Sequence, residues 1–292
     1  MLTYDVVIIG SGIAGMTSAI YLKRAGINPL IIEQNTPGGQ LNKSHLIENY
    51  PGFNGISGPE LALNIYKQVK DLGVEYFYEK VSEVNFKENT ITTDSKNIKY
   101  KYLIIASGRT PKKINLDNIN HLSYCSLCDG NLYKNKDVTV LGGGNSALED
   151  AIYLSQICNK VTIIHRKNNF NAEESLIDKV LNTKNINIIF DNEIKDAKEE
   201  NDNIHINLKH GSITTNGLFI CIGYLPDSSI YNLEKDKGYI IVNHKMQTSI
   251  PNVYACGDII KKEYYQLTTA TSEGTICASE IAKKISRDKN EN

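Results

Sequence analysis

The stretch Asp5-Val-Val-Ile-Ile-Gly10-Ser-Gly12-Ile-Ala-Gly15 joins an apolar strand pattern to a glycine-rich turn. A helical pattern follows, and a second apolar run, Pro29-Leu-Ile-Ile, then ends at Glu33. A strand, a Gly-x-Gly-x-x-Gly turn, a helix and a second strand with an acidic end make up the dinucleotide-binding unit of a doubly wound domain. This stretch therefore predicts an α/β fold built on a parallel sheet.

The same pattern occurs a second time. Asp137-Val-Thr-Val-Leu-Gly142-Gly-Gly144-Asn-Ser-Ala147 is followed by a helical stretch and by Val161-Thr-Ile-Ile-His165. The distance from the first glycine to the end of the second strand is 23 residues in both units. The repeat predicts two Rossmann-like dinucleotide-binding domains, and alternating residues at 80–93 and 186–213 predict a small antiparallel meander in each.

The second unit interrupts the first domain. An apolar strand pattern, Val253-Tyr-Ala-Cys-Gly257-Asp258, returns near the C-terminus and is expected to complete the first sheet. Polar residues 111–120 and a second crossing near 242–247 are the expected linkers. We therefore expect residues 1–112 and 246–292 to form the first, discontinuous domain and residues 113–245 to form the second.

Composition and charge limit the classes of partner that the chain is expected to bind. The chain has 292 residues with 41% hydrophobic and 22% charged residues, and a formal net charge of −1. This balance is that of a globular protein and gives no electrostatic reason to expect a nucleic-acid or membrane partner. The chain passes straight from Met1 into a strand pattern without a signal-peptide pattern, so a cytoplasmic location is expected.

The first glycine turn has the chemistry of a pyrophosphate site. Gly10 permits the tight turn, and Gly12 lets the backbone approach a phosphate at the helix N-terminus, where free N–H groups favour negative charge. Glu33 is placed to accept hydrogen bonds from a ribose. A glycine turn that only packs a strand on a helix is the alternative, which the complete strand–turn–helix–strand context disfavours.

The second turn ends in basic residues instead. His165 occupies the position that matches Glu33, and Arg166 and Lys167 follow it. A basic cluster suits a ribose 2′-phosphate, so this position favours NADPH over NADH. The alternative is that these charged residues merely end a strand at the surface.

The pair Cys125-Ser-Leu-Cys128 lies between the two glycine units and is followed by Asp129. Two cysteines with this spacing can form a disulfide, and a helix that begins here would stabilise a thiolate. Half of a zinc site is the alternative, but zinc needs further paired ligands. The other four cysteines are single and lie in apolar contexts, which predicts inert core residues and no metal site: Cys158, Cys221, Cys256 and Cys277.

Together with Gly38-Gly39-Gln40-Leu41, residues 47–52 and Gly257-Asp258, these motifs resemble one family over nearly the whole chain. The chain resembles the bacterial-type, low-molecular-weight thioredoxin reductases among the flavoprotein pyridine nucleotide-disulfide oxidoreductases. The resemblance implies an enzyme with FAD on the first domain and NADPH on the second. NADPH would reduce FAD, and the reduced FAD would reduce the Cys125–Cys128 disulfide. The resulting dithiol would then reduce thioredoxin or a thioredoxin-like protein. It also implies a homodimer.

The resemblance assigns roles to individual residues. Cys128 would face the flavin, Cys125 would attack the partner disulfide, and Asp129 would donate or accept a proton, although an acid at a helix start is its plainer role. The expected FAD residues are Gly10, Ser11, Gly12, Ala14, Gly15, Glu33, Gln34, Gly39, Gln40, Leu41, Asn49, Val81, Ala106, Ser107, Gly108, Gly257, Asp258, Gln266 and Leu267. The expected NADPH residues are Gly142, Gly144, Asn145, Ser146, Ala147, His165, Arg166 and Lys167.

Several positions depart from the family pattern. Ser126-Leu127 stands where most members have Ala-Thr, and Lys167, Asn171 and Tyr265 stand where members usually have arginine. These changes leave the electron donor open between NADPH, NADH and ferredoxin, with an oxygen-using dithiol oxidase as a further alternative. Relatives that use ferredoxin generally lack the second glycine loop, which is intact here. A catalytically silent flavin-binding protein is the alternative from a different class, and the cysteine pair argues against it.

Both the cysteine pair and the nicotinamide site are expected in the second domain, although both must reach one flavin in the first. We therefore expect the domains to rotate about the two linkers during turnover. An engineered crosslink that fixes the domains should slow steady-state turnover strongly. Full turnover by the crosslinked enzyme would contradict the rotation.

Overall fold

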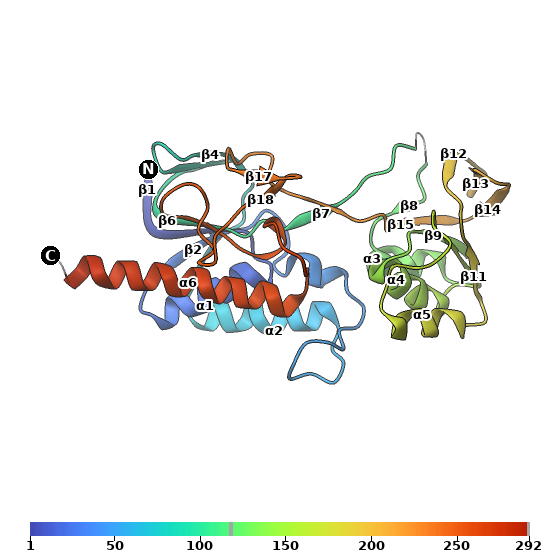
Figure 1. The fold of residues 1–292 in the computed structure, drawn as a ribbon, viewed down its shortest axis with the longest axis horizontal. Coiled ribbons are helices and arrows are strands. Elements are labelled where there is room, and N and C mark those ends of the chain that lie inside the picture. Colours follow the sequence, from blue (N-terminus) through green and yellow to red (C-terminus); the bar gives the residue numbers. More distant parts are fainter. Residues whose placement is uncertain (117–118, 291–292) are drawn as a thin grey trace. The chain divides into compact units, whose positions relative to one another are not determined.

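The computed structural model describes residues 1–116 and 119–290, so Asp117 and Asn118 of the expected first linker lie outside the described residues. The chain divides into two compact units (Figure 1). Unit 1 contains Met1–Thr110 and Pro226–Asn292, and unit 2 contains Pro111–Leu225. The first crossing thus falls within two residues of the expected boundary, whereas the second comes at Pro226 and not near residue 245.

The residues after Pro226 belong to unit 1 because their apolar side chains pack there. Tyr231 and Ile240 are buried in one cluster with Ile105, Val253 and Ile259. The short hairpin of β17 (Lys235–Asp236) and β18 (Tyr239–Ile240) lies in this segment. The expected linker at 242–247 is therefore a turn inside unit 1. The true crossings are β7 (Arg109–Pro111) and β16 (Tyr224–Pro226), which pair with each other.

Unit 1 is built on a seven-stranded sheet with the order β3-β2-β1-β6-β5-β4, to which β19 adds beside β6. The parallel strands are β1 (Leu2–Ile9), β2 (Pro29–Ile32), β3 (Glu75–Phe77), β6 (Asn97–Ile105) and β19 (Val253–Ala255). The antiparallel strands β4 (Val81–Asn85) and β5 (Thr90–Thr93) extend β6, which confirms the predicted first meander. Ile9 pairs with both Ile32 and Ile105, so three strands end at one level.

Side chains of β1 alternate between two cores. Val6 and Ile8 pack with the helices α1 (Ile13–Arg24), α2 (Gly58–Asp71) and α6 (Leu267–Asn290), whereas Val7 and Ile9 face the other core. Figure 1 shows these three helices on one side of the sheet. Because both faces are covered, the central strands read as continuous apolar runs, as the sequence indicated.

Unit 2 repeats the plan with a five-stranded parallel sheet in the order β11-β10-β9-β15-β8. Its strands are β8 (Leu122–Ser123), β9 (Asp137–Leu141), β10 (Lys160–Ile164), β11 (Ile186–Ile189) and β15 (Gly217–Ile220). The helices α4 (Asn145–Ser155) and α5 (Glu174–Leu181) pack on one face. The antiparallel strands β12 (Ile194–Glu200), β13 (Asn203–Leu208) and β14 (Ser212–Thr215) form a separate sheet.

The predicted second meander at 186–213 is therefore only partly correct. Its first four residues, Ile186–Ile189, are the parallel edge strand β11, because this apolar run pairs with β10. The meander begins only at Ile194. Within the part of the chain that the structure describes, no helix has the length and hydropathy needed to cross a membrane.

The crossing of α1 and α6 generates a stability prediction. A Cβ at Gly274 would lie 2.4 Å from the carbonyl oxygen of Ala14. Gly274→Ala should therefore destabilise unit 1 by about 1–3 kcal/mol, because the clash outweighs the better helix propensity of alanine. Thermal unfolding measures the loss, and Ser286→Ala at an exposed position of α6 is the control. An unchanged Tm for Gly274→Ala would contradict the close helix contact.

Candidate active site

The first glycine turn brings a helix start against a strand end. Gly10 has φ +102°, and a Cβ there would lie 2.4 Å from the carbonyl oxygen of Ala106. A Cβ at Gly15 would lie 2.1 Å from the carbonyl oxygen of Gly10, whereas one at Gly12 would meet no atom within 4 Å. Gly10 and Gly15 are thus required for packing, and Gly12 leaves open space above the N-terminus of α1.

That N-terminus fits an anionic group. Gly12 is the N-cap of α1, offers no side-chain cap, and no acidic residue lies in the first turn. The N–H groups at this end are therefore left for a ligand. Glu33 is buried, and its carboxylate accepts hydrogen bonds from the backbone N–H of Ser11 at 2.7 Å and of Asn35 at 2.8 Å. Burial raises the pKa of Glu33 and outweighs the opposite effect of these hydrogen bonds.

Three other predicted segments meet this turn. The backbone of Gly38 donates to Ser11 at 2.7 Å, and Gly12 and Gly38 form an isolated bridge. The short helix η1 (Gly39–Lys43) follows, and the Gln40 side chain donates to the Arg109 carbonyl at 2.8 Å. The Asn49 side chain reaches Gln266 at 3.5 Å. Segments that are far apart in sequence thus surround the ends of the parallel strands, where nucleotides bind in such folds.

Some predicted FAD residues have other roles for their side chains. Leu41 and Val81 are buried in the two apolar cores of unit 1. The Ser107 hydroxyl donates to the Asp227 carbonyl at 3.0 Å and accepts from the Tyr231 hydroxyl at 3.3 Å. Gln34 is exposed. The side chains of Leu41, Val81 and Ser107 already pack or hydrogen-bond within unit 1, so only their backbone groups are left to contact a ligand.

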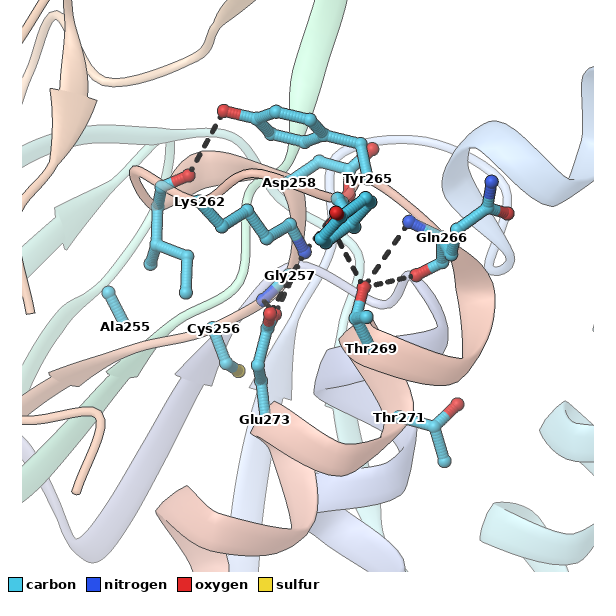
Figure 2. A network of polar contacts seen from close by, with 12 residues as sticks. Ala255, Cys256, Gly257, Asp258, Lys262, Tyr265, Gln266, Thr269, Thr271 and Glu273 are labelled. Atoms are coloured by element: carbon cyan, nitrogen blue, oxygen red, sulfur yellow. Dashed lines mark hydrogen bonds and ion pairs between the residues drawn. The ribbon is translucent and has the colours of Figure 1, made fainter. Parts of the chain in front are cut away.

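A charged network around Asp258 was missed by the sequence reasoning (Figure 2). Asp258 lies in η3 (Gly257–Ile259), and its carboxylate pairs with Arg109 at 2.8 Å and with Lys262 at 3.4 Å. Lys262 also pairs with Glu273 of α6 at 2.9 Å, and Glu273 accepts the Gly257 N–H at 2.8 Å. Burial raises the pKa of Glu273 and outweighs the opposite effect of the nearby Lys262. The sequence offered one sign of this network, because Glu273 is an acidic residue among small and apolar residues of α6.

Tyr265 is part of the same network. The Arg109 guanidinium carbon lies 4.6 Å from the centre of its ring, and the Lys262 nitrogen lies 5.4 Å from it. Both distances fit cation–π contacts. Burial, with smaller contributions from Tyr239, raises the pKa of Tyr265 to about 12. Arg109 thus brings a guanidinium beside the position where the sequence has tyrosine in place of the usual arginine.

The second glycine turn repeats the geometry of the first. A Cβ at Gly142 would lie 2.3 Å from the carbonyl oxygen of Cys221, whereas the nearest atom to one at Gly144 is 3.6 Å away. Gly144 is the N-cap of α4 without a side-chain cap. The Asn145 side chain and Glu173 exchange two hydrogen bonds of 2.9 Å, which join the start of α4 to that of α5.

His165 differs from the expected member of a basic cluster. It is buried against Gly143 and stacks on Phe170 at 6.0 Å between ring centres. Burial, reinforced by the positive charges of Lys167 and Arg166, lowers its pKa, so the imidazole is neutral. Its Nε2 atom is buried with no hydrogen-bond partner among the described residues. Such an atom fits a ligand polar group, and the exposed Arg166 and Lys167 supply the positive charge.

Cys125 and Cys128 form a disulfide with 5.3 Å between their Cα atoms. Cys125 is the N-cap of the short helix α3 (Ser126–Asp129), and its sulfur accepts the Cys128 N–H at 3.2 Å. The Ser123 hydroxyl accepts the Cys125 N–H at 3.1 Å and donates to the Asp129 carboxylate at 2.6 Å. The predicted pair and the predicted acid are thus held together, and Cys128 is exposed.

Comparisons with known proteins point in the same direction. The model of the pyridine nucleotide-disulphide oxidoreductases matches residues 4–274. The chain is similar to a thioredoxin reductase of Bacillus subtilis, at 37% identity over 95% of this chain and 93% of that one. It is also similar to one of Ureaplasma parvum, at 38% identity over 98% of each. The structure resembles Lactococcus lactis thioredoxin reductase (FR conformation), with a TM-score of 0.90, 34% identity and coverage of 96% and 98%.

The buried imidazole generates a pH prediction. A neutral buried histidine with a lowered pKa takes up its proton more readily when the chain unfolds, so stability falls as the pH drops below the unfolded-state pKa of about 6.5. His165→Gln should therefore lose less stability than the wild type between about pH 7.5 and pH 5.5. Urea unfolding at both pH values measures this difference. Exposed His244→Gln is the control, and an equal loss in His165→Gln and the wild type would refute the buried neutral imidazole.

Proposed function

Because the chain belongs to the pyridine nucleotide-disulphide oxidoreductases, we propose that it is a thioredoxin reductase that uses NADPH and bound FAD. Its substrate would be the disulfide of thioredoxin or of a thioredoxin-like protein. The observation that carries the proposal is the Cys125–Cys128 disulfide at the start of α3, within the unit that also holds the second glycine turn. A disulfide so placed is a redox centre and not a structural crosslink of distant segments.

Each glycine turn is proposed to bind a different cofactor. Each turn provides a helix N-terminus without a side-chain cap, with no atom closer than 3.6 Å to a Cβ on its N-cap glycine. We assign FAD to the turn at Gly10, which ends at Glu33, and NADPH to the turn at Gly142, which is followed by the basic Arg166 and Lys167. Glu33 would accept ribose hydroxyls of FAD, and the Asp258 network would hold the segment after β19 against it. Bound FAD would supply the two electrons, taken from NADPH, that reduce the disulfide.

The residues around the disulfide carry out the thiol chemistry. Reduction of the S–S bond takes two electrons and two protons and yields two thiols. Cys125 is proposed to attack the partner disulfide as a thiolate, which forms a mixed disulfide and releases the second partner sulfur. Cys128 then attacks the Cys125 sulfur, reforms the intramolecular disulfide and releases the reduced partner. The start of α3 stabilises thiolate charge, and Asp129, held by Ser123, exchanges the proton.

We favour NADPH over the other electron donors because of the basic residues that follow the second glycine turn. The second turn is complete, and the exposed Arg166 and Lys167 follow its closing strand. A guanidinium can bind a 2′-phosphate through two parallel hydrogen bonds, which the ribose hydroxyl of NADH cannot use.

Anaerobic titration of the FAD-loaded protein tests the proposal. NADPH should bleach the flavin absorbance at lower concentrations than NADH, and added oxidised thioredoxin should restore it. Arg166→Gln should weaken NADPH about tenfold and leave NADH nearly unchanged, because it removes the contact to the 2′-phosphate alone. If neither nucleotide bleached the flavin, the chain would instead be a ferredoxin-dependent reductase or an oxygen-using oxidase.

Trapping of a mixed disulfide tests the roles of the two cysteines. Cys128→Ser should form a stable disulfide between Cys125 and a thioredoxin variant whose single active-site cysteine is supplied as a mixed disulfide with 2-nitro-5-thiobenzoate. The Cys125 thiolate attacks that mixed disulfide and releases the thionitrobenzoate anion. Cys125→Ser should form much less of this species, since Cys128 is assigned to the flavin side. Non-reducing electrophoresis measures both variants, with flavin content as the control for folding. Equal trapping by the two variants would contradict the assignment, and stronger trapping by Cys125→Ser would reverse it.

A further inference from the structure

A buried serine between the two redox cysteines is tied to a carboxylate of α4. The Ser126 hydroxyl donates to one oxygen of Asp150 at 2.5 Å, and the Cys221 thiol donates to the other at 3.0 Å. Ser126 is 1% exposed and is the first residue of α3. All three residues belong to unit 2, and the reaction described above uses none of them.

The contacts of Asp150 have the pattern of an ionised carboxylate. A hydroxyl and a thiol each donate to a different oxygen of Asp150, and an ionised carboxylate accepts at both oxygens. Burial and the contact with Asp150 raise the pKa of the Cys221 thiol well above its usual value. Cys221 is therefore a neutral donor, which fits a negatively charged Asp150 as its acceptor.

The contacts also join the redox helix to the second glycine turn. Cys221 follows β15, and its carbonyl oxygen is the atom that a Cβ at Gly142 would meet at 2.3 Å. Asp150 lies on α4, the helix that begins at this turn. One carboxylate thus connects the start of α3, the end of β15 and the helix of the nucleotide turn.

We propose that Asp150 is a positioning residue for the Cys125–Cys128 pair, which holds the start of α3 through Ser126 and sets the balance between disulfide and dithiol. The proposal rests on the redox role given to this pair above. Reduction creates thiols that ionise at the start of α3, and the negative charge of Asp150, hydrogen-bonded to the residue next to Cys125, opposes that ionisation. Asp150 therefore favours the disulfide, and its charge acts only while Ser126 keeps it in place.

The test is the equilibrium of the pair with glutathione redox buffers in the FAD-containing protein. Free thiols are alkylated after acid quenching, and mass spectrometry quantifies the peptide with Cys125 and Cys128 in both states. Asp150→Asn, which keeps an acceptor but removes the charge, should shift the equilibrium about tenfold toward the dithiol, or about 30 mV. Ser126→Ala should shift it at least threefold in the same direction. The double variant should shift it no further than the larger single shift.

Controls separate this proposal from the wider function. Ser155→Ala removes another α4 hydroxyl, one that donates to the Ile152 carbonyl, and should leave the equilibrium unchanged. The measurement needs neither NADPH nor thioredoxin, so it stands even if the chain reduced another partner. A shift below threefold or toward the disulfide in Ser126→Ala, or a double variant that shifts further than the larger single shift, would overturn the proposal. Thermal unfolding checks each variant, and Ser126→Ala alone decides if Asp150→Asn fails to fold.

Discussion

The structure depends on the direct contact between each glycine turn and the end of a neighbouring parallel strand. At Gly10 and at Gly142 a Cβ would lie within 2.4 Å of the carbonyl oxygen of the residue that follows that strand, Ala106 or Cys221, so no side chain is tolerated there. This contact sets each helix with its N-terminus at the ends of the strands. The N–H groups that the helix cannot satisfy are then left for an anionic ligand, beside a glycine with no atom closer than 3.6 Å to the place of a Cβ.

The same constraint explains the order of segments along the chain. The sheet of unit 1 is completed by β19, which pairs with β6 although about 150 residues separate them. Its carboxyl end carries Gly257 and Asp258 to the level of the first turn, where Lys262 and Glu273 hold this segment. A cofactor site formed at strand ends can thus draw on both ends of the chain, and the inserted unit carries the redox pair.

Two carboxylates, Asp129 and Asp150, are hydrogen-bonded to serines next to the disulfide. Asp129 is held by Ser123 on one side of the pair, and Asp150 is held by Ser126 at the start of α3. Each serine hydroxyl donates a hydrogen bond to one of these carboxylates. In the roles proposed above, Asp129 exchanges the proton and Asp150 supplies a fixed charge, and these roles differ because Asp129 is the last residue of α3 whereas Asp150 lies on α4.

The sequence by itself determined the two dinucleotide units, the interrupted first domain and the disulfide pair. These features depend on local patterns: apolar strands, glycine spacing and a two-residue gap between cysteines. Only the tertiary structure decided that the chain returns to unit 1 at Pro226, where Tyr231 and Ile240 find their core. It likewise decided that His165 is buried and neutral. It also brought Arg109, Lys262 and Glu273 to the segment at Gly257 and Asp258, and Asp150 to Ser126 beside the disulfide. The reason is physical: burial and ion pairing arise from residues far apart in sequence, and no local spacing encodes which of them will meet.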